Sequence, residues 1–258
     1  MITRLLFILF CFTIELIAES KVHTKIEAGI YFPVLDGSIN NTTSSFSLSQ
    51  DNNYSDATAS YFALDIFVEY DYAPNLRVDY FYMQTNQDAR LSKSVLIADG
   101  VFSSSISSVI DFNVLNTVLY QDFKQRGQLF SLLGSKYYTG DFEIDVGING
   151  KYILWNYEVQ DRTNLNSSTS WVRVNQFIPL PYFGFKYYLY DFSFYSNIST
   201  LSFVEAKSMN YQVGITYNVI GGVSLSAAYL YEEFEAVEIK DTIKFNTSGY
   251  KFSFMYAF

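Results

Sequence analysis

The chain has 258 residues, 23 of them Tyr and 24 Phe, and a formal net charge of −9. An acidic balance argues against nucleic acid as a partner, and a single cysteine, Cys11, excludes a disulfide framework. Mean hydropathy is only +0.07 despite the aromatic content. A mean hydropathy near zero is expected of barrel strands, because each has an apolar face toward lipid and a polar face toward the lumen.

The first 20 residues have the pattern of a secretory signal peptide. Arg4 precedes the apolar run 5–14, and Ala18-Glu19-Ser20 offers a cleavage site after Ser20 or, alternatively, after Ala18. Cleavage would also remove Cys11, and it would leave 16 basic and 24 acidic residues. No later apolar run has the ~20 residues that a spanning helix needs, so 21–258, read as one domain, would cross a membrane as strands.

Alternation of apolar and polar residues predicts ten strands. They cover 22–32, 61–70, 76–82, 109–120, 142–151, 177–189, 192–203, 211–217, 223–232 and 249–258. Pro33 is expected to end the first strand, because proline cannot donate to a ladder. In the fourth strand the apolar parity changes near Val114, which suggests a β-bulge.

The connections alternate between long and short. Long outer loops are expected near 33–59, 84–108 and 154–176, with Trp155 in an outer aromatic girdle. The segment 121–141 is too long for a short turn, and it is either an interfacial helix or an additional hairpin that adds two strands. The pattern predicts an all-β, antiparallel up-and-down transmembrane β-barrel of 10 strands, with 8 or 12 as alternatives.

The last strand is strongly amphipathic, and in a soluble protein it would leave an edge open to aggregation. Its apolar face consists of Tyr250, Phe252, Phe254, Tyr256 and Phe258. In a closed barrel this strand pairs with the first. The segment resembles the C-terminal signature of bacterial outer-membrane barrels, which implies recognition by the barrel-assembly machinery. Outer-membrane lipid and lipopolysaccharide would then surround the protein.

Several short segments together resemble a family of outer-membrane β-barrel proteins from epsilonproteobacteria, the class of Campylobacter and Helicobacter. They are Glu27-Ala28-Gly29, Pro74-Asn75-Leu76-Arg77, Ile178-Pro179-Leu180-Pro181-Tyr182 and the terminal Phe258. The resemblance implies a barrel in the bacterial outer membrane and no particular activity. The long segment 121–141 departs from the short turn expected at that place.

The residue types give little support to an enzyme, a cofactor or a metal site. The one histidine, His23, is predicted at the periplasmic mouth of the barrel. Each known kind of barrel hydrolase needs a histidine near a site at the outer, membrane-facing or lipid-facing side. With one histidine and no cysteine after the signal, zinc and copper lack their usual ligands. We therefore predict no enzymatic activity, no cofactor and no metal.

The candidate site is a network of charges predicted to point into the lumen. Its members are Lys25, Glu27, Asp65, Glu69, Arg77, Asp79, Asp111, Glu143, Asp145, Lys151, Lys186, Glu232 and Lys251. These charges must pair or stay hydrated. The first interpretation is a largely filled lumen in a protein with a structural or surface-exposed role. The alternatives are a narrow cation-preferring channel and an adhesin or ligand-binding barrel acting through outer loops that carry Tyr54 and Trp171.

Overall fold

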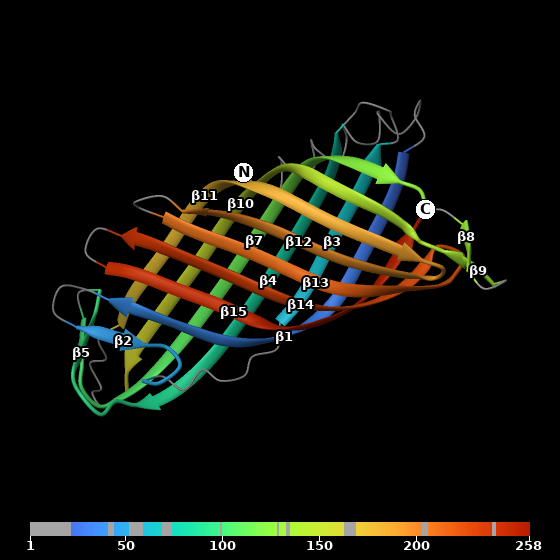
Figure 1. Ribbon diagram of the computed structural model, residues 1–258. Coiled ribbons are helices and arrows are strands. Elements are labelled where there is room, and N and C mark those ends of the chain that lie inside the picture. Colours follow the sequence, from blue (N-terminus) through green and yellow to red (C-terminus); the bar gives the residue numbers. More distant parts are fainter. Residues whose placement is uncertain are drawn as a thin grey trace.

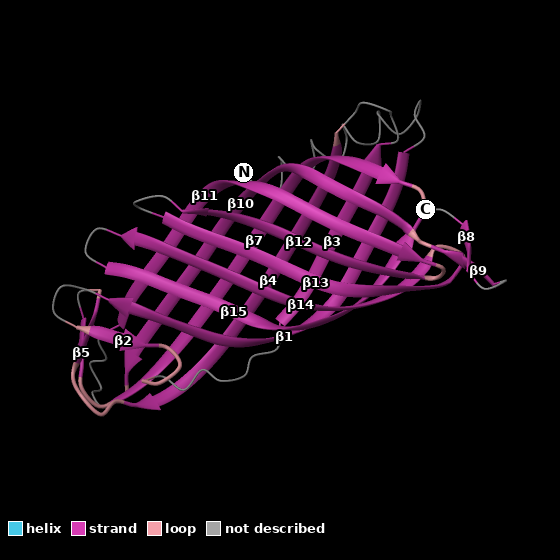
Figure 2. Ribbon diagram, viewed as in Figure 1, coloured by secondary structure: helices cyan, strands magenta, loops and turns pink. Residues whose placement is uncertain are grey.

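The computed structural model describes residues 22–40, 44–51, 59–68, 74–98, 100–127, 129–132, 135–162, 169–202, 206–238 and 241–258. The predicted signal peptide, Tyr54 and Glu69 lie outside these ranges. Strands form almost all of the described chain (Figures 1 and 2). Within these ranges no helix is long and apolar enough to cross a bilayer.

Ten strands form one closed antiparallel barrel. They are β1 (Val22–Asn40), β3 (Ala59–Val68), β4 (Asn75–Arg90), β7 (Ser105–Gln125), β10 (Asp141–Asp161), β11 (Thr169–Leu189), β12 (Phe192–Ser202), β13 (Ala206–Ile220), β14 (Val223–Glu238) and β15 (Asp241–Ala257). Each pairs with the next, and β15 pairs with β1 from Lys25↔Ala257 to Asn40↔Thr242. This confirms the predicted ten-stranded up-and-down barrel, in which closure leaves no terminal edge strand.

The two ends of the barrel differ. At the turn end, β11–β12 and β13–β14 are joined by two-residue turns at Tyr190-Asp191 and Gly221-Gly222. At the loop end, β2 (Ser45–Ser47) pairs with the end of β1, and β5 (Val95–Ile97) pairs with β6 (Gly100–Phe102). Figure 1 shows β2 and β5 at one end and the C-terminus at the other.

Of the two alternatives for 121–141, the hairpin is right and the helix is wrong. β7 continues to Gln125, and β8 (Leu129–Leu132) pairs with β9 (Ser135–Tyr138). This hairpin is a separate two-stranded sheet at the turn end (Figure 1), so it adds no strand to the barrel.

The predicted loops near 33–59, 84–108 and 154–176 are in large part strand, because the barrel is taller than a bilayer requires. β1 runs through Pro33 to Asn40, and β7, β10 and β11 have 21 residues each. At about 3.3 Å per residue and a tilt of about 40°, such strands span about 50 Å, roughly twice the ~25 Å apolar band of outer-membrane barrels.

Pro33 lies inside β1, opposite Gly249 of β15. Pro33 therefore does not end β1 as predicted. Pro179 and Pro181 lie where β11 has one neighbour missing from its described ladders. The β11–β12 ladder ends at Tyr182↔Ser199, next to Pro181. A strand edge without a partner tolerates a residue that cannot donate.

The outer face of the wall changes character along the barrel axis. On β4 the outward side chains are Leu76, Val78, Tyr80 and Tyr82, followed by Gln84, Asn86, Asp88 and Arg90. On β10 the outward side chains from Phe142 to Leu154 are apolar apart from Gly150, and Asn156, Glu158 and Gln160 follow. The apolar half is the turn-end half, and it has the outer surface of a membrane-spanning barrel.

The inner face changes in the opposite sense. Inward from the turn end, β10 presents Glu143, Asp145, Asn149 and Lys151, followed by Ile153, Trp155, Tyr157 and Val159. The loop-end half therefore has a polar outer face and a dry apolar core, as in a soluble barrel. We call this loop-end half the extension.

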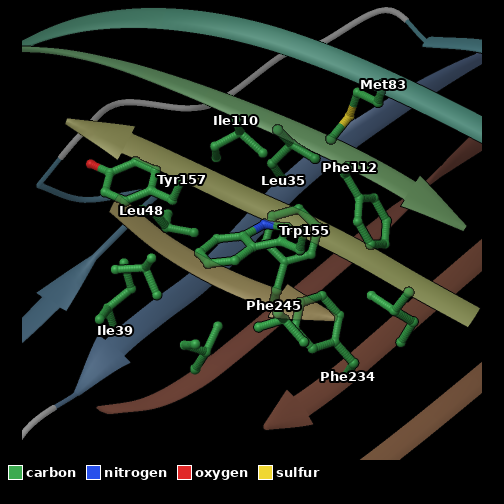
Figure 3. Close-up of a cluster of buried hydrophobic side chains, with 14 of the residues drawn as sticks. Leu35, Ile39, Leu48, Met83, Ile110, Phe112, Trp155, Tyr157, Phe234 and Phe245 are labelled. Atoms are coloured by element: carbon green, nitrogen blue, oxygen red, sulfur yellow. The ribbon is translucent and has the colours of Figure 1, made fainter. Parts of the chain in front are cut away.

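Aromatic side chains fill the core of the extension (Figure 3). The Phe112 ring lies 4.9 Å from that of Phe245 and 5.6 Å from that of Phe81, measured between centroids. Trp155 stacks on Tyr157 at 6.0 Å. Trp155 is fully buried, so its assignment to an outer girdle was wrong.

Two further predictions on β7 are corrected by this core. Its ladders with β4 and β10 are continuous, so there is no bulge near Val114. Asp111 lies between Ile110 and Phe112, both of which point into the core, so Asp111 faces outward and does not belong to the lumen network.

Candidate functional site

The candidate site is the charged lumen of the turn-end half. Eleven of the thirteen predicted charges lie inside the barrel: Lys25, Glu27, Asp65, Arg77, Asp79, Glu143, Asp145, Lys151, Lys186, Glu232 and Lys251. Asp111 faces outward, and Glu69 is outside the described residues. The described members of the predicted network that lie in the lumen are six acidic and five basic residues.

An ion pair crosses the seam between β1 and β15. Lys251 donates to Glu27, and the Ser253 hydroxyl donates to the same carboxylate oxygen at 2.6 Å. Both charged side chains are almost completely buried. Because a buried charge without a partner is costly, this pair couples the first strand to the last.

Arg77 and Lys186 each hold two carboxylates. Arg77 Nε lies 3.0 Å from an oxygen of Asp65 and 3.0 Å from an oxygen of Asp79. Lys186 Nζ lies 2.5 Å from Glu143 Oε1 and 3.0 Å from Asp145 Oδ2. These contacts join β3 to β4 and β10 to β11, and they supply the pairing that charges in a narrow lumen require.

The network also crosses the lumen between strands that are not neighbours. Lys151 of β10 donates to Glu232 of β14, and to Ser208 Oγ of β13 at 3.0 Å. Lys151 precedes Ile153 on β10, and Glu232 precedes Phe234 on β14. This strut therefore lies directly against the apolar core of the extension.

Two charges at the turn end were missed because β7 was predicted to stop at Tyr120. Lys124 Nζ lies 2.7 Å from Asp122 Oδ2 and 3.8 Å from Glu143 Oε2, and Asn75 donates to Asp122 at 2.8 Å. Asp122 and Lys124 continue the inward parity of Tyr120, so a longer strand would have included them.

A polar cavity of about 290 Å³ opens at the turn end, and we call it the basin. Lys25, Arg77, Lys124 and Lys186 are among the side chains that line it. A cavity of about 30 Å³ lies deeper, beside Asn149 and Glu232. Within the described ranges no three His, Cys, Asp or Glu side chains are grouped so that they could hold a metal ion.

No protein-family model matches the sequence, and a comparison with curated proteins finds no match. Among solved structures, the translocator domain of the autotransporter NalP from Neisseria meningitidis is similar, at 11% identity and a TM-score of 0.45 over 94% of this chain and 91% of that one. Neisserial surface protein A is similar at 10% identity and a TM-score of 0.32, over 91% of this chain and 96% of that one. OmpT, an outer membrane protein of Vibrio cholerae, is similar at 7% identity and a TM-score of 0.26, over 93% of this chain and 100% of that one. The fold itself, a closed antiparallel β-barrel with an apolar band on its outer face, follows from the strand pairing and the burial pattern. Likenesses this distant say nothing about what this barrel does.

Proposed function

We propose that the protein is a non-conducting barrel of the bacterial outer membrane that carries a rigid extension at the cell surface. The observation that carries this proposal is the change of both faces along the wall. Where the outer face is apolar the inner face is ionic, and where the outer face is polar the inner face is apolar. A wall of this kind suits lipid in one half and water in the other.

Three features support a closed lumen. The strut from Lys151 to Glu232 spans the barrel at the base of the extension. Beyond it, Trp155, Phe112 and their neighbours pack as a core. At the loop end, the completely buried side chains of Phe46 and Phe102 add a further apolar layer.

Planar-bilayer recording on refolded protein tests the closed lumen. We expect no conductance steps, with folding verified by a mobility shift between unheated and boiled samples on a gel. Reproducible cation-selective steps would overturn the proposal and favour the narrow channel.

Surface exposure of the extension is tested by cysteine labelling, because residues 21–258 contain no cysteine. Asn86→Cys, on the outer face of the extension, should react with a membrane-impermeant maleimide on intact cells. Ile148→Cys, on the apolar outer face of β10, is the matched control and should not react. Equal reactivity of the two variants would contradict the assigned membrane level.

One observation favours binding at the cell surface as a second candidate function. Trp171, which is half exposed on the outer face of the extension, has the Arg173 guanidinium 5.1 Å from its ring centroid. An exposed indole held by a guanidinium is a typical contact anchor. Binding of cells or matrix that is unchanged in Trp171→Ala would count against this role.

The outward row of β15, continued by the terminal Phe258, supports the proposed contact with the barrel-assembly machinery. Tyr250, Phe252, Phe254, Tyr256 and Phe258 are all exposed on the outer surface. Membership of the epsilonproteobacterial barrel family stays a prediction.

A further inference from the structure

One strand of the extension has an open edge. β11 pairs with β10 from Gln160↔Thr169 to Asp141↔Tyr188, but its ladder with β12 begins only at Tyr182↔Ser199. In the described part of the chain, residues 169–181 therefore have no neighbour on the β12 side. The unpaired N–H and C=O groups of such an edge form a template for another strand.

The edge is held in place by the wall and the core behind it. The β10–β11 ladder is continuous along the whole edge. The inward side chains Val172, Val174 and Ile178 are at most 4% exposed. Because β11 is already ordered, an incoming strand would lose conformational entropy mainly of its own.

The edge lacks the features by which proteins usually block pairing, which are lysine, proline and bulges. Residues 169–178 contain neither lysine nor proline. Pro179 and Pro181 lie at the base of the edge, next to the end of the β12 ladder. The stretch that is open to pairing is therefore 169–178.

The outer face of this stretch is suited to a protein partner. Trp171 is 50% exposed and Phe177 is 65% exposed. Arg173 lies between them, and within the described ranges its recorded partner is the Trp171 ring and not a carboxylate. On the β10 side the residue opposite Arg173 is Asn156. Because opposite charges stabilise cross-strand pairs, the incoming strand should place a carboxylate opposite Arg173.

The inner face calls for apolar side chains. At the base of the edge, Leu201 of β12 packs against the core of the extension and is only partly buried. Successive side chains of an added strand point alternately outward and inward. Apolar residues at its inward positions would extend this core.

β4 also continues past the end of its β3 ladder, at Tyr82. Its outward side chains beyond that point are Gln84, Asn86, Asp88 and Arg90, which are polar or charged. The β11 edge differs because it has two exposed aromatic rings beside its free backbone. This difference favours β11 as the site.

We propose that the β11 edge at 169–178 binds an extended segment of another protein by strand addition. The segment has apolar residues inward and polar residues outward, with a carboxylate opposite Arg173. Backbone hydrogen bonds supply the affinity, and the alternate side chains supply the specificity. This inference rests on the proposed function, which exposes the extension at the cell surface, and it gives surface binding a mode of recognition.

A second copy in the same membrane does not fit this edge. Both β11 strands would run toward the bilayer, and tilts of about 40° in opposite senses would cross them at roughly 80° instead of aligning them. The partner is therefore a separate polypeptide with a free extended segment.

Fluorescence anisotropy on the full chain, refolded in detergent, tests the proposal with a labelled peptide, Thr-Val-Thr-Val-Glu-Val-Thr-Val-Thr. The sequence is palindromic, so Glu lies opposite Arg173 whichever way the peptide runs. We expect saturable binding. The fully N-methylated peptide should not bind, because it cannot donate backbone hydrogen bonds.

Charge reversal locates the peptide on the edge. Arg173→Glu should weaken binding roughly threefold to tenfold, and a peptide with Lys in place of Glu should bind this variant better than the wild type. Lys244→Glu is the matched control, because Lys244 is exposed on β15, which has β1 and β14 as neighbours, and binding should not change.

The proposal is overturned if the peptide does not bind, if the N-methylated peptide binds equally well, or if Arg173→Glu and Lys244→Glu have the same effect. The assay in detergent does not depend on the membrane level of the extension. Binding in detergent with none on intact cells would support the edge and count against the cell-surface location.

Discussion

The apolar core of the extension makes a strong prediction for Phe112→Ala. Phe112 is 1% exposed, and its ring lies within 6 Å of the rings of Phe81, Phe234 and Phe245. Truncating a buried phenylalanine removes apolar contacts and leaves a cavity, at a cost of about 3–5 kcal/mol. We expect Phe112→Ala to lower the free energy of unfolding by this amount.

The neighbouring residue provides the control. Asp111 faces outward from the extension, and surface substitutions of this kind usually change stability by less than about 0.5 kcal/mol. Both variants are measured by urea unfolding of refolded protein, with fluorescence of the buried Trp155 as the signal. A cost below about 1 kcal/mol for Phe112→Ala, or an equal cost for Asp111→Ala, would refute the packed core.

Two further predictions concern the seam and the membrane level. Lys251→Met should destabilise the barrel by about 3–5 kcal/mol in the same urea assay, because it leaves the Glu27 carboxylate buried without its cation. Adding Glu27→Gln should restore part of the loss, and purely additive effects would argue against the pair. Ile148→Arg should cost about 2–4 kcal/mol in lipid bilayers, whereas Asn86→Arg should be nearly neutral. Equal costs would place the two residues at the same depth.

The sequence alone was sufficient for the fold, because alternation defines strands wherever the two faces differ. The parity assigned to the turn-end half agrees with the structure: Ile30 and Phe32 face outward, and Glu27 and Tyr31 face inward. Closure of the barrel also followed from the amphipathic terminal strand. These features depend on local pattern and on the need to satisfy backbone groups in lipid.

The extension was missed because alternation gives the parity of a strand but not which parity is inside. On β7 the apolar parity changes between Val114 and Leu115, where the surroundings of the outer face change from water to lipid. A bulge produces the same pattern in a sequence. The Ser, Asn and Asp residues of the outer face also have loop-like composition, and this hid the upper ends of β4, β7, β10 and β11.

Most members of the lumen network could be predicted from parity, but their partners could not. Lys251 and Glu27 are more than 200 positions apart, and Lys151 reaches Glu232 across the barrel rather than on an adjacent strand. These partnerships depend on tilt and stagger, which no local pattern records. Asp122 and Lys124 needed only a longer β7.

The seam between β1 and β15 also has a consequence for biosynthesis. β1 finds its final neighbour only after some two hundred further residues have left the ribosome, so this is the most distant ladder to form, and closure over such a separation is slow. Until then the unpaired edge of β1 is open to pairing with a strand of another molecule. A chaperone that binds the unfolded chain would have to prevent this pairing.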